Sequence, residues 1–140
     1  MESVYHAINK QVANYTLLYT KLHNYHWNVK GVHFFTLHEL FENYYNETTD
    51  QLDEMAERLL SIGGTPIGTL KETLELASIQ EASGSEDSSQ MVETLISDFG
   101  VLAKEAEKIM EVADEATGDL FLGIKQGMEK RIWMLNSYLQ

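Results

Sequence analysis

The spacing of large side chains constrains the fold of this chain more than any other feature of its sequence. In the first helix-length stretch these side chains recur at alternating intervals of three and four residues, as they do along the buried face of a packed helix. The positions are Tyr5, Ile8, Val12, Tyr15, Tyr19, Leu22 and His26. Three later stretches carry a similar pattern, and the 140 residues include a single proline. The pattern predicts an all-α fold with four long amphipathic helices.

Glycines and capping sequences indicate where the first two helices begin and end. Gly31 is expected to stop the first helix. Thr36-Leu37-His38-Glu39 has the form of a capping box at the start of the second, with Phe35 and Leu40 placed as a hydrophobic staple. The second helix is expected to end at Gly63-Gly64, because glycine is favoured just beyond a helix C-terminus.

A long connection separates this pair from the last two helices. It spans about residues 63–88 and contains a short helix, expected over residues 69–79 with a capping box at its start. The third long helix is expected over residues 86–115. After a break at Thr117-Gly118, the fourth is expected to continue to about Tyr138.

The length of the connection decides the topology. Short links make the first and second helices antiparallel, and likewise the third and fourth. The connection is long enough to return along a helix of roughly 40 Å, which favours one crossover over a simple up-down-up-down arrangement. The sequence thus predicts a ferritin-like four-helix bundle with one long crossover carrying a short extra helix. We expect a single domain over residues 1–140.

Composition narrows the classes of function. The absence of cysteine excludes disulfides, thiolate ligands and cysteine nucleophiles. No apolar run approaches the length of a membrane span or follows a basic N-terminal segment, so we expect a cytoplasmic protein with no membrane partner. The 22 acidic residues outnumber the 10 basic ones and give a net charge of −12. Because DNA affinity comes largely from cations that neutralise phosphates, DNA binding is not expected.

Histidine and carboxylate side chains follow the second helix at intervals typical of metal ligands. His38 and Glu42 lie near its start, and Asp53 and Glu57 lie further along it. One chain cannot gather all four, because His38 and Asp53 are separated by roughly 22 Å on an ideal helix. If two copies of the helix pack antiparallel about a two-fold axis, the first pair of one copy faces the second pair of the other. Such a site forms twice in a dimer.

His26 can add a second imidazole to this site, because the chain turns back after the first helix. Mixed histidine and carboxylate ligation suits Fe(II), whose oxidised form needs anionic oxygen ligands. The alternative is that the carboxylates belong to a solvated helix face and that His26 is a hydrogen-bonded core histidine. The spacing alone leaves both interpretations open.

Three segments resemble the Dps family of miniferritins, and the resemblance covers essentially the whole chain. The first is His26-Trp27-Asn28-Val29-Lys30-Gly31, followed by Phe34-Phe35-Thr36-Leu37-His38-Glu39. The second is Asp53-Glu54-Met55-Ala56-Glu57-Arg58-Leu59-Leu60-Ser61-Ile62-Gly63-Gly64-Thr65-Pro66. The third, Ile132-Trp133-Met134-Leu135, is similar to the last helix of the family.

The resemblance implies a hollow homododecamer that oxidises Fe(II), preferably with hydrogen peroxide rather than dioxygen, and stores ferric mineral inside. Such a ferroxidase would protect the cell from oxidative damage. Its sites would lie between two-fold-related subunits and take up to two irons each. His26, His38 and Glu42 would come from one subunit, and Glu42 stands where many relatives carry aspartate. Asp53 and Glu57 would come from the other.

The resemblance implies two further roles. Trp27 resembles a family tryptophan that intercepts oxidising equivalents, although an aromatic side chain at this place can equally pack at an interface. Asp119, Asp114 and Glu115 lie where acidic residues of the family line pores for iron entry, with Asp119 favoured. Carboxylates at such a turn can also be helix caps and first-turn charges.

The remaining histidines are weaker candidates. His23 and His26 have a spacing that could chelate a metal ion, but an isolated match of this kind is seldom a ligand. His33, in the loop, is a weaker candidate still. No glutamate precedes any histidine by three residues, so the usual di-iron centre inside a ferritin-like bundle is not expected.

The resemblance also suggests an alternative function, the compaction of DNA. Relatives that bind DNA often use lysine-rich terminal extensions, and neither Met1-Glu2-Ser3-Val4 nor Tyr138-Leu139-Gln140 provides one. A dodecamer of such subunits would carry a charge of about −144, which should repel DNA. The sequence says nothing about a surface-recognition role, which some relatives have.

Overall fold

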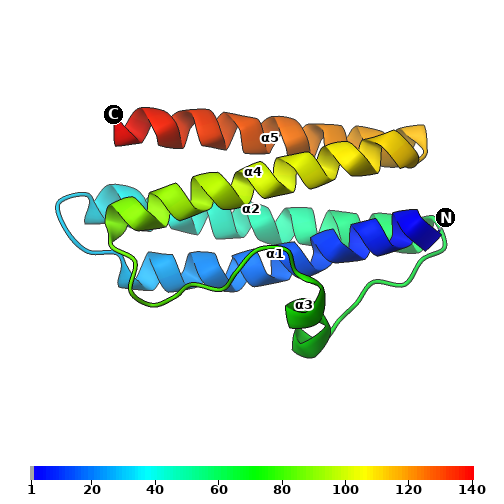
Figure 1. The fold of residues 1–140 in the computed structure, drawn as a ribbon, viewed down its shortest axis with the longest axis horizontal. Coiled ribbons are helices and arrows are strands. Elements are labelled where there is room, and N and C mark those ends of the chain that lie inside the picture. Colours follow the sequence, from blue (N-terminus) through cyan, green and yellow to red (C-terminus); the bar gives the residue numbers. More distant parts are fainter. Residues whose placement is uncertain (1) are drawn as a thin grey trace.

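Residues 2–140, the part of the chain that the structure describes, form five helices. The computed structural model includes side chains from Ser3 onward. The helices are α1 (Glu2–Asn28), α2 (Phe34–Ser61), α3 (Leu70–Leu76), α4 (Ser88–Val112) and α5 (Glu115–Leu139). α1 packs along α2 and α4 along α5, while α3 lies in the crossover against α1 (Figure 1). This arrangement confirms the predicted four-helix bundle. Among the described residues, no helix combines the length and apolar character needed to cross a membrane.

The core is built from large side chains of all four long helices. The largest fully buried aromatic side chains are Tyr15, Tyr25, Phe41, Phe99 and Phe121. Burying one such ring contributes on the order of 1.5–3 kcal/mol. The guanidinium of Arg131 is buried with them, where it lies 4.5 Å from the centroid of Tyr44 and pairs with the carboxylate of Glu47.

The turn between α1 and α2 is tighter than the sequence predicts. Gly31 adopts a φ of +109°, and its carbonyl accepts a hydrogen bond from the Phe34 amide at 3.1 Å. Because the chain reverses direction at Gly31, the first turn of α2 begins at Phe34, before the predicted cap at Thr36. His33 is the N-cap residue, and its side chain makes no capping hydrogen bond. The predicted capping box is wrong, because Thr36 lies inside the helix. The predicted staple is also wrong, because the Phe35 side chain is 84% exposed.

The C-terminus of α2 confirms the predicted glycine stop. Gly63 has a φ of +98°, and its amide donates to the Leu60 carbonyl, while the Gly64 amide donates to the Leu59 carbonyl. This is the Schellman arrangement, which satisfies carbonyls left without partners at a helix end. A Cβ added at Gly64 would lie 2.3 Å from Leu59 Cδ1, so the close approach requires glycine.

The crossover contains the predicted short helix. The Thr69 side chain accepts from the Glu72 amide and caps α3, as expected. α3 ends at Leu76, earlier than the predicted Ile79, because the backbone becomes extended at Ala77. The extended segment carries Ile79 into the core, where its side chain is buried.

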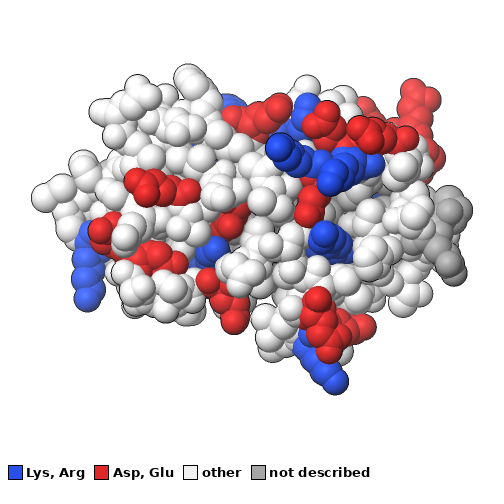
Figure 2. Space-filling view, in the orientation of Figure 1, with Lys and Arg blue, Asp and Glu red and all other residues white. Residues whose placement is uncertain are grey.

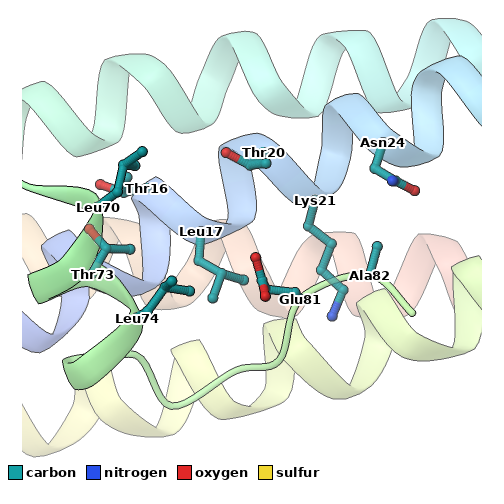
Figure 3. Close-up of a pocket in the computed structure, with 10 residues that line it drawn as sticks. All are labelled: Thr16, Leu17, Thr20, Lys21, Asn24, Leu70, Thr73, Leu74, Glu81 and Ala82. Carbon is teal, nitrogen blue, oxygen red and sulfur yellow. The ribbon is translucent and has the colours of Figure 1, made fainter. Parts of the chain in front are cut away.

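A buried lysine anchors the crossover to the bundle. Lys21 of α1 donates to the Gln80 carbonyl at 2.7 Å and pairs with Asp98 of α4 at 2.7 Å. Beside it a cavity of about 300 Å³ lies between α1 and the crossover, lined in part by Leu17 and Leu74 (Figure 3). The polar contacts of Lys21 hold the crossover in place without filling this cavity.

The starts of α4 and α5 depend on aspartate caps. Asp87 and Gln90 form a capping box at α4, which the sequence did not reveal. α5 begins at Glu115 with Asp114 as its N-cap, so the break predicted at Thr117-Gly118 is wrong. The helix continues through this pair because Asp114 already satisfies the Thr117 amide, at 3.1 Å.

Candidate metal centre

Two imidazoles meet where α1 ends and α2 begins. His26 lies in the last turn of α1 and is buried, and His38 lies near the start of α2. Their rings are stacked, with 3.7 Å between centroids and 12° between planes. Nδ1 of His26 lies 2.6 Å from the backbone oxygen of His38, and Nδ1 of His38 lies 2.7 Å from that of His26. A reciprocal pair of hydrogen bonds thus joins the two helices.

These hydrogen bonds fix the tautomer of both rings. Because a carbonyl oxygen can only accept, the proton of each neutral ring lies on Nδ1 and each Nε2 keeps a lone pair. A hydrogen bond from Nδ1 to a backbone carbonyl also fixes the orientation of a metal-ligating histidine and raises its basicity. The arrangement therefore offers two oriented imidazole nitrogens to a metal ion.

A carboxylate lies beside this pair. Glu42 is one turn beyond His38 on α2, and its Oε1 lies 4.0 Å from Nε2 of His26. Its side chain is about half exposed, whereas that of His26 is buried. His26 thus lies beside both His38 and Glu42, and we call these three residues the histidine half-site.

The other two predicted ligands lie elsewhere on α2. Asp53 and Glu57, which we call the carboxylate half-site, are both exposed. Asp53 is roughly 22 Å along the helix from His38. Within residues 2–140 of one chain, no three histidine or carboxylate side chains are grouped so that they could hold a metal ion. A single chain therefore presents two separate half-sites.

An aromatic cluster borders the histidine half-site and consists of Tyr19, His23, Trp27 and Tyr45. The Tyr45 ring is edge-on to His26, with 5.3 Å between centroids, and stacks on His23 at 3.7 Å. His23 Nδ1 hydrogen-bonds to the Tyr19 carbonyl at 2.7 Å. The spacing of His23 from His26 suits a chelating pair, but His23 instead forms the centre of this cluster.

Two oxidisable side chains of this cluster, Trp27 and Tyr45, differ in exposure. Trp27 is 70% exposed, and its ring contacts His23 with 5.3 Å between centroids. Tyr45 is half-buried, and its burial, the Glu42 carboxylate and Tyr19 together raise its pKa. Sequence reasoning did not assign Tyr45 a role, although its position two turns beyond His38 places it on the same helix face.

The predicted pore residues lie at the opposite end of the bundle, at the turn from α4 to α5 (Figure 1). Asp114 accepts hydrogen bonds from the Thr117 amide and hydroxyl and pairs with Arg58 Nη2 at 3.1 Å. These hydrogen bonds, with Arg58, lower the pKa of Asp114. Glu115 and Asp119 are exposed. The predicted alternative, a helix cap, is thus confirmed for Asp114, and the pore role of all three residues stays a prediction.

Charge on the surface is mixed in sign. On the face drawn in Figure 2, lysine and arginine side chains are few and are flanked by aspartate and glutamate. The net charge of −12 makes the acidic groups dominant. This distribution suits the attraction of cations more than that of a polyanion.

Comparisons with known proteins show which family shares this fold. The ferritin-like domain family matches residues 5–140. General stress protein 20U of Bacillus subtilis (strain 168) is 55% identical over 99% of this chain and 98% of its own length. A Dps protein from Bacillus brevis has the same fold, with a TM-score of 0.98, 49% identity and coverage of 99% of this chain and 96% of that one.

A more distant structure names the chemistry of the wider group. The Dps protein from Vibrio cholerae O1 is described as a member of a broad superfamily of ferritin-like diiron-carboxylate proteins. It has a TM-score of 0.95 and 34% identity to this chain, and covers 99% of it and 90% of its own length. The chain belongs to the ferritin-like family, and within that family to the Dps proteins.

Proposed function

We propose that this chain oxidises Fe(II) at sites completed between two copies of itself. The observation that carries the proposal is the reciprocal bonding of His26 and His38, which leaves a lone pair on each Nε2, that of His26 4.0 Å from Glu42 Oε1. An antiparallel pairing of α2 about a two-fold axis would set the carboxylate half-site of a second copy opposite them. The diiron-carboxylate description of the Vibrio cholerae relative supports iron as the metal.

The donor set suits the oxidation of iron. Neutral imidazole nitrogens bind Fe(II), and carboxylate oxygens stabilise the Fe(III) that forms. Two Fe(II) ions each give one electron to hydrogen peroxide, which takes up two protons and leaves as two water molecules. In this stoichiometry no hydroxyl radical is released, so the reaction removes both iron and peroxide harmlessly.

Storage of the product requires an enclosed volume. We propose that the chain assembles into a dodecameric shell, with ferric mineral deposited inside. Iron would enter through pores lined by acidic residues at the α4–α5 turn. Asp119 suits this role better than Asp114, because the Asp114 carboxylate is already engaged by Thr117 and Arg58. Asp119→Asn should slow iron uptake by the assembled shell and leave its size unchanged.

A double substitution tests the oxidation site. His38→Ala with Asp53→Ala removes one ligand from each half-site and should abolish peroxide-dependent Fe(II) oxidation, followed by the absorbance of Fe(III). The matched control is His33→Ala with Asp50→Ala, which removes the same residue types from exposed positions. Both proteins should keep the oligomer size of the parent. Unchanged oxidation kinetics in the first variant would refute the assignment.

We also propose that protection by this protein does not involve DNA. The net charge of −12 per chain is multiplied by assembly, and polyanions repel one another at ordinary salt. A gel shift at low salt and neutral pH should therefore show free DNA at all protein concentrations. Clear retardation of the DNA would favour the nucleoid-compacting role instead.

A further inference from the structure

A third ring belongs to the stack at the histidine half-site. Phe34, the first residue of α2, lies one turn before His38 on the same helix face. Its ring stacks on the His38 imidazole, with 4.8 Å between centroids and 21° between planes. His26 stacks on the same imidazole at 3.7 Å and 12°. Two rings at these distances would overlap if they shared one face of His38, so Phe34 and His26 lie on opposite faces of it.

The two histidines differ in how firmly the rest of the protein holds them. His26 is buried, and the ring of Tyr45 packs edge-on against it with 5.3 Å between centroids. His38 is only half-buried, near the start of α2. Because the ring torsion χ2 of a histidine is broad, the rotamer of His38 does not by itself fix the direction of its Nε2. That direction depends on the groups around the ring.

The hydrogen bond of His38 restrains one side of its ring. It joins Nδ1 to the His26 carbonyl at 2.7 Å, and the ring can still tilt about this contact. A tilt displaces Nε2, whereas the geometry of a metal site has to be held within about 0.5 Å. His26 opposes the tilt on one face of the ring, and Phe34 opposes it on the other.

The tight turn before α2 places Phe34 for this contact. The Phe34 amide donates to the Gly31 carbonyl at 3.1 Å, and the positive φ of Gly31 permits the reversal. The next residue, Phe35, is edge-on to the Phe34 ring with 5.4 Å between centroids, but its side chain is 84% exposed. Phe34 thus contacts an imidazole of the half-site, while Phe35 is a solvent-exposed neighbour of Phe34.

We propose that Phe34 is a positioning residue of the metal centre, an inference that rests on the proposed function. By covering the second face of His38, Phe34 holds Nε2 in the direction in which it binds the metal ion. The affinity of the site for divalent metal ions is thereby raised. Phe34 has no ligand atom of its own, so its effect passes entirely through the orientation of His38.

Titration with Co(II) measures this effect without any oxidation step. The assembled protein is titrated in the absence of oxidant, and the d–d absorbance of bound Co(II), a neighbour of Fe(II) in the order of metal affinities, reports occupancy. The absorbance that is lost in His38→Ala identifies the metal ion held by His38. Phe34→Leu keeps an apolar side chain but removes the flat ring. It should weaken Co(II) binding roughly 10-fold, as the loss of a group that orients a ligand commonly does.

Further variants separate positioning from packing. Phe34→Met also lacks a ring and should weaken Co(II) binding by a similar factor, whereas Phe34→Tyr keeps a flat ring and should bind as the parent does. Phe35→Leu makes the same substitution at the exposed neighbour and should leave the affinity unchanged. Urea unfolding and oligomer size are measured for each variant, because a residue that merely packs alters stability without altering the Co(II) affinity of the folded protein.

The remaining outcomes distinguish the role of Phe34 from the site itself. If Phe34→Leu or Phe34→Met assembles and binds Co(II) as tightly as the parent, the inference is overturned. Equal losses of affinity in Phe34→Leu and Phe34→Tyr, or in Phe34→Leu and Phe35→Leu, overturn it as well. If the parent binds Co(II) no more tightly than His38→Ala does, the proposed metal centre fails, and with it the proposed function.

Discussion

The two short turns of the bundle lie at opposite ends of the molecule and use their polar side chains differently. At the α1–α2 turn, each imidazole donates a hydrogen bond from Nδ1 to a backbone carbonyl, which leaves the lone pair on Nε2. At the α4–α5 turn, the Asp114 carboxylate caps α5 and pairs with Arg58. A two-nitrogen ring can hold the fold and still offer a ligand, whereas this carboxylate is engaged at both oxygens.

The difference explains why sequence proximity to a turn is a poor guide to function. Both turns carry residues suited to metal ions, but they differ in how these residues are used. His26 and His38 at the first turn keep oriented Nε2 lone pairs, whereas Asp114 at the second uses its carboxylate for local stability.

Loss of an imidazole should affect oxidation far more than loss of the cap. His38→Ala should slow Fe(II) oxidation by at least roughly 100-fold, since loss of a mere second-shell partner commonly costs 10–100-fold. Asp114→Ala should leave the rate per assembled site close to that of the parent. Stopped-flow absorbance with peroxide measures both. Equal losses in the two variants would remove the distinction between the turns.

The α4–α5 turn should respond mainly in stability. Thr117 is buried, donates to Asp114 and accepts from Arg58 Nε at 2.9 Å. Thr117→Val keeps the shape but leaves polar partners unsatisfied, so it should lower the free energy of unfolding by about 1–3 kcal/mol. Urea unfolding measures this, and the exposed Thr36→Val serves as control. If Thr117→Val leaves the free energy of unfolding unchanged, the stability of the turn does not depend on these hydrogen bonds.

The charge of Asp114 should make part of this stability depend on pH. Its pKa is lowered in the folded state, so its contribution is complete above the unfolded value of about 3.9 and is lost as pH falls through the folded pKa. Asp114→Asn keeps a capping oxygen without the charge. The parent should exceed this variant in urea midpoint near neutral pH, and the two should converge in acid. A difference that is constant with pH would contradict this origin.

The smallest effect is expected where the sequence suggested a cap and the structure has none. Thr36→Ala should change the free energy of unfolding by less than about 0.5 kcal/mol, because α2 begins two residues earlier. Thermal unfolding is sufficient to measure it. If Thr36→Ala lowers the free energy of unfolding by as much as the removal of an N-cap residue does, Thr36 acts as a cap and the predicted capping box is correct.

The sequence predicted the helices because apolar periodicity is summed over many residues. The glycine stop at Gly63-Gly64 was equally readable, since few other residues adopt its conformation. The starts of the helices were harder to predict from the sequence. Asp114 and Thr117 both have capping side chains, and the choice between them depends on Arg58, which arrives from α2. A contact between distant segments is not visible in a local pattern.

The candidate site likewise combines features that a local sequence pattern predicts with contacts that depend on the fold. The spacing of His38 and Glu42 on one helix predicted that they share a face. The reciprocal hydrogen bonds with His26 depend on the tight reversal at Gly31, and so emerged from the fold alone. Tyr45 was missed because its contact with His26, which lies on another helix, depends on the fold.

The central claim is that each oxidation site is completed by two copies of the chain, and mixing two inactive variants tests it most directly. One variant carries His26→Ala and His38→Ala, and the other carries Asp53→Ala and Glu57→Ala. Each alone should be inactive. In a mixed dimer one of the two sites combines both intact half-sites, so random assembly of equal amounts should restore about a quarter of the parental activity. If each site lies within one chain, mixed assemblies will show no recovery, and the account is contradicted.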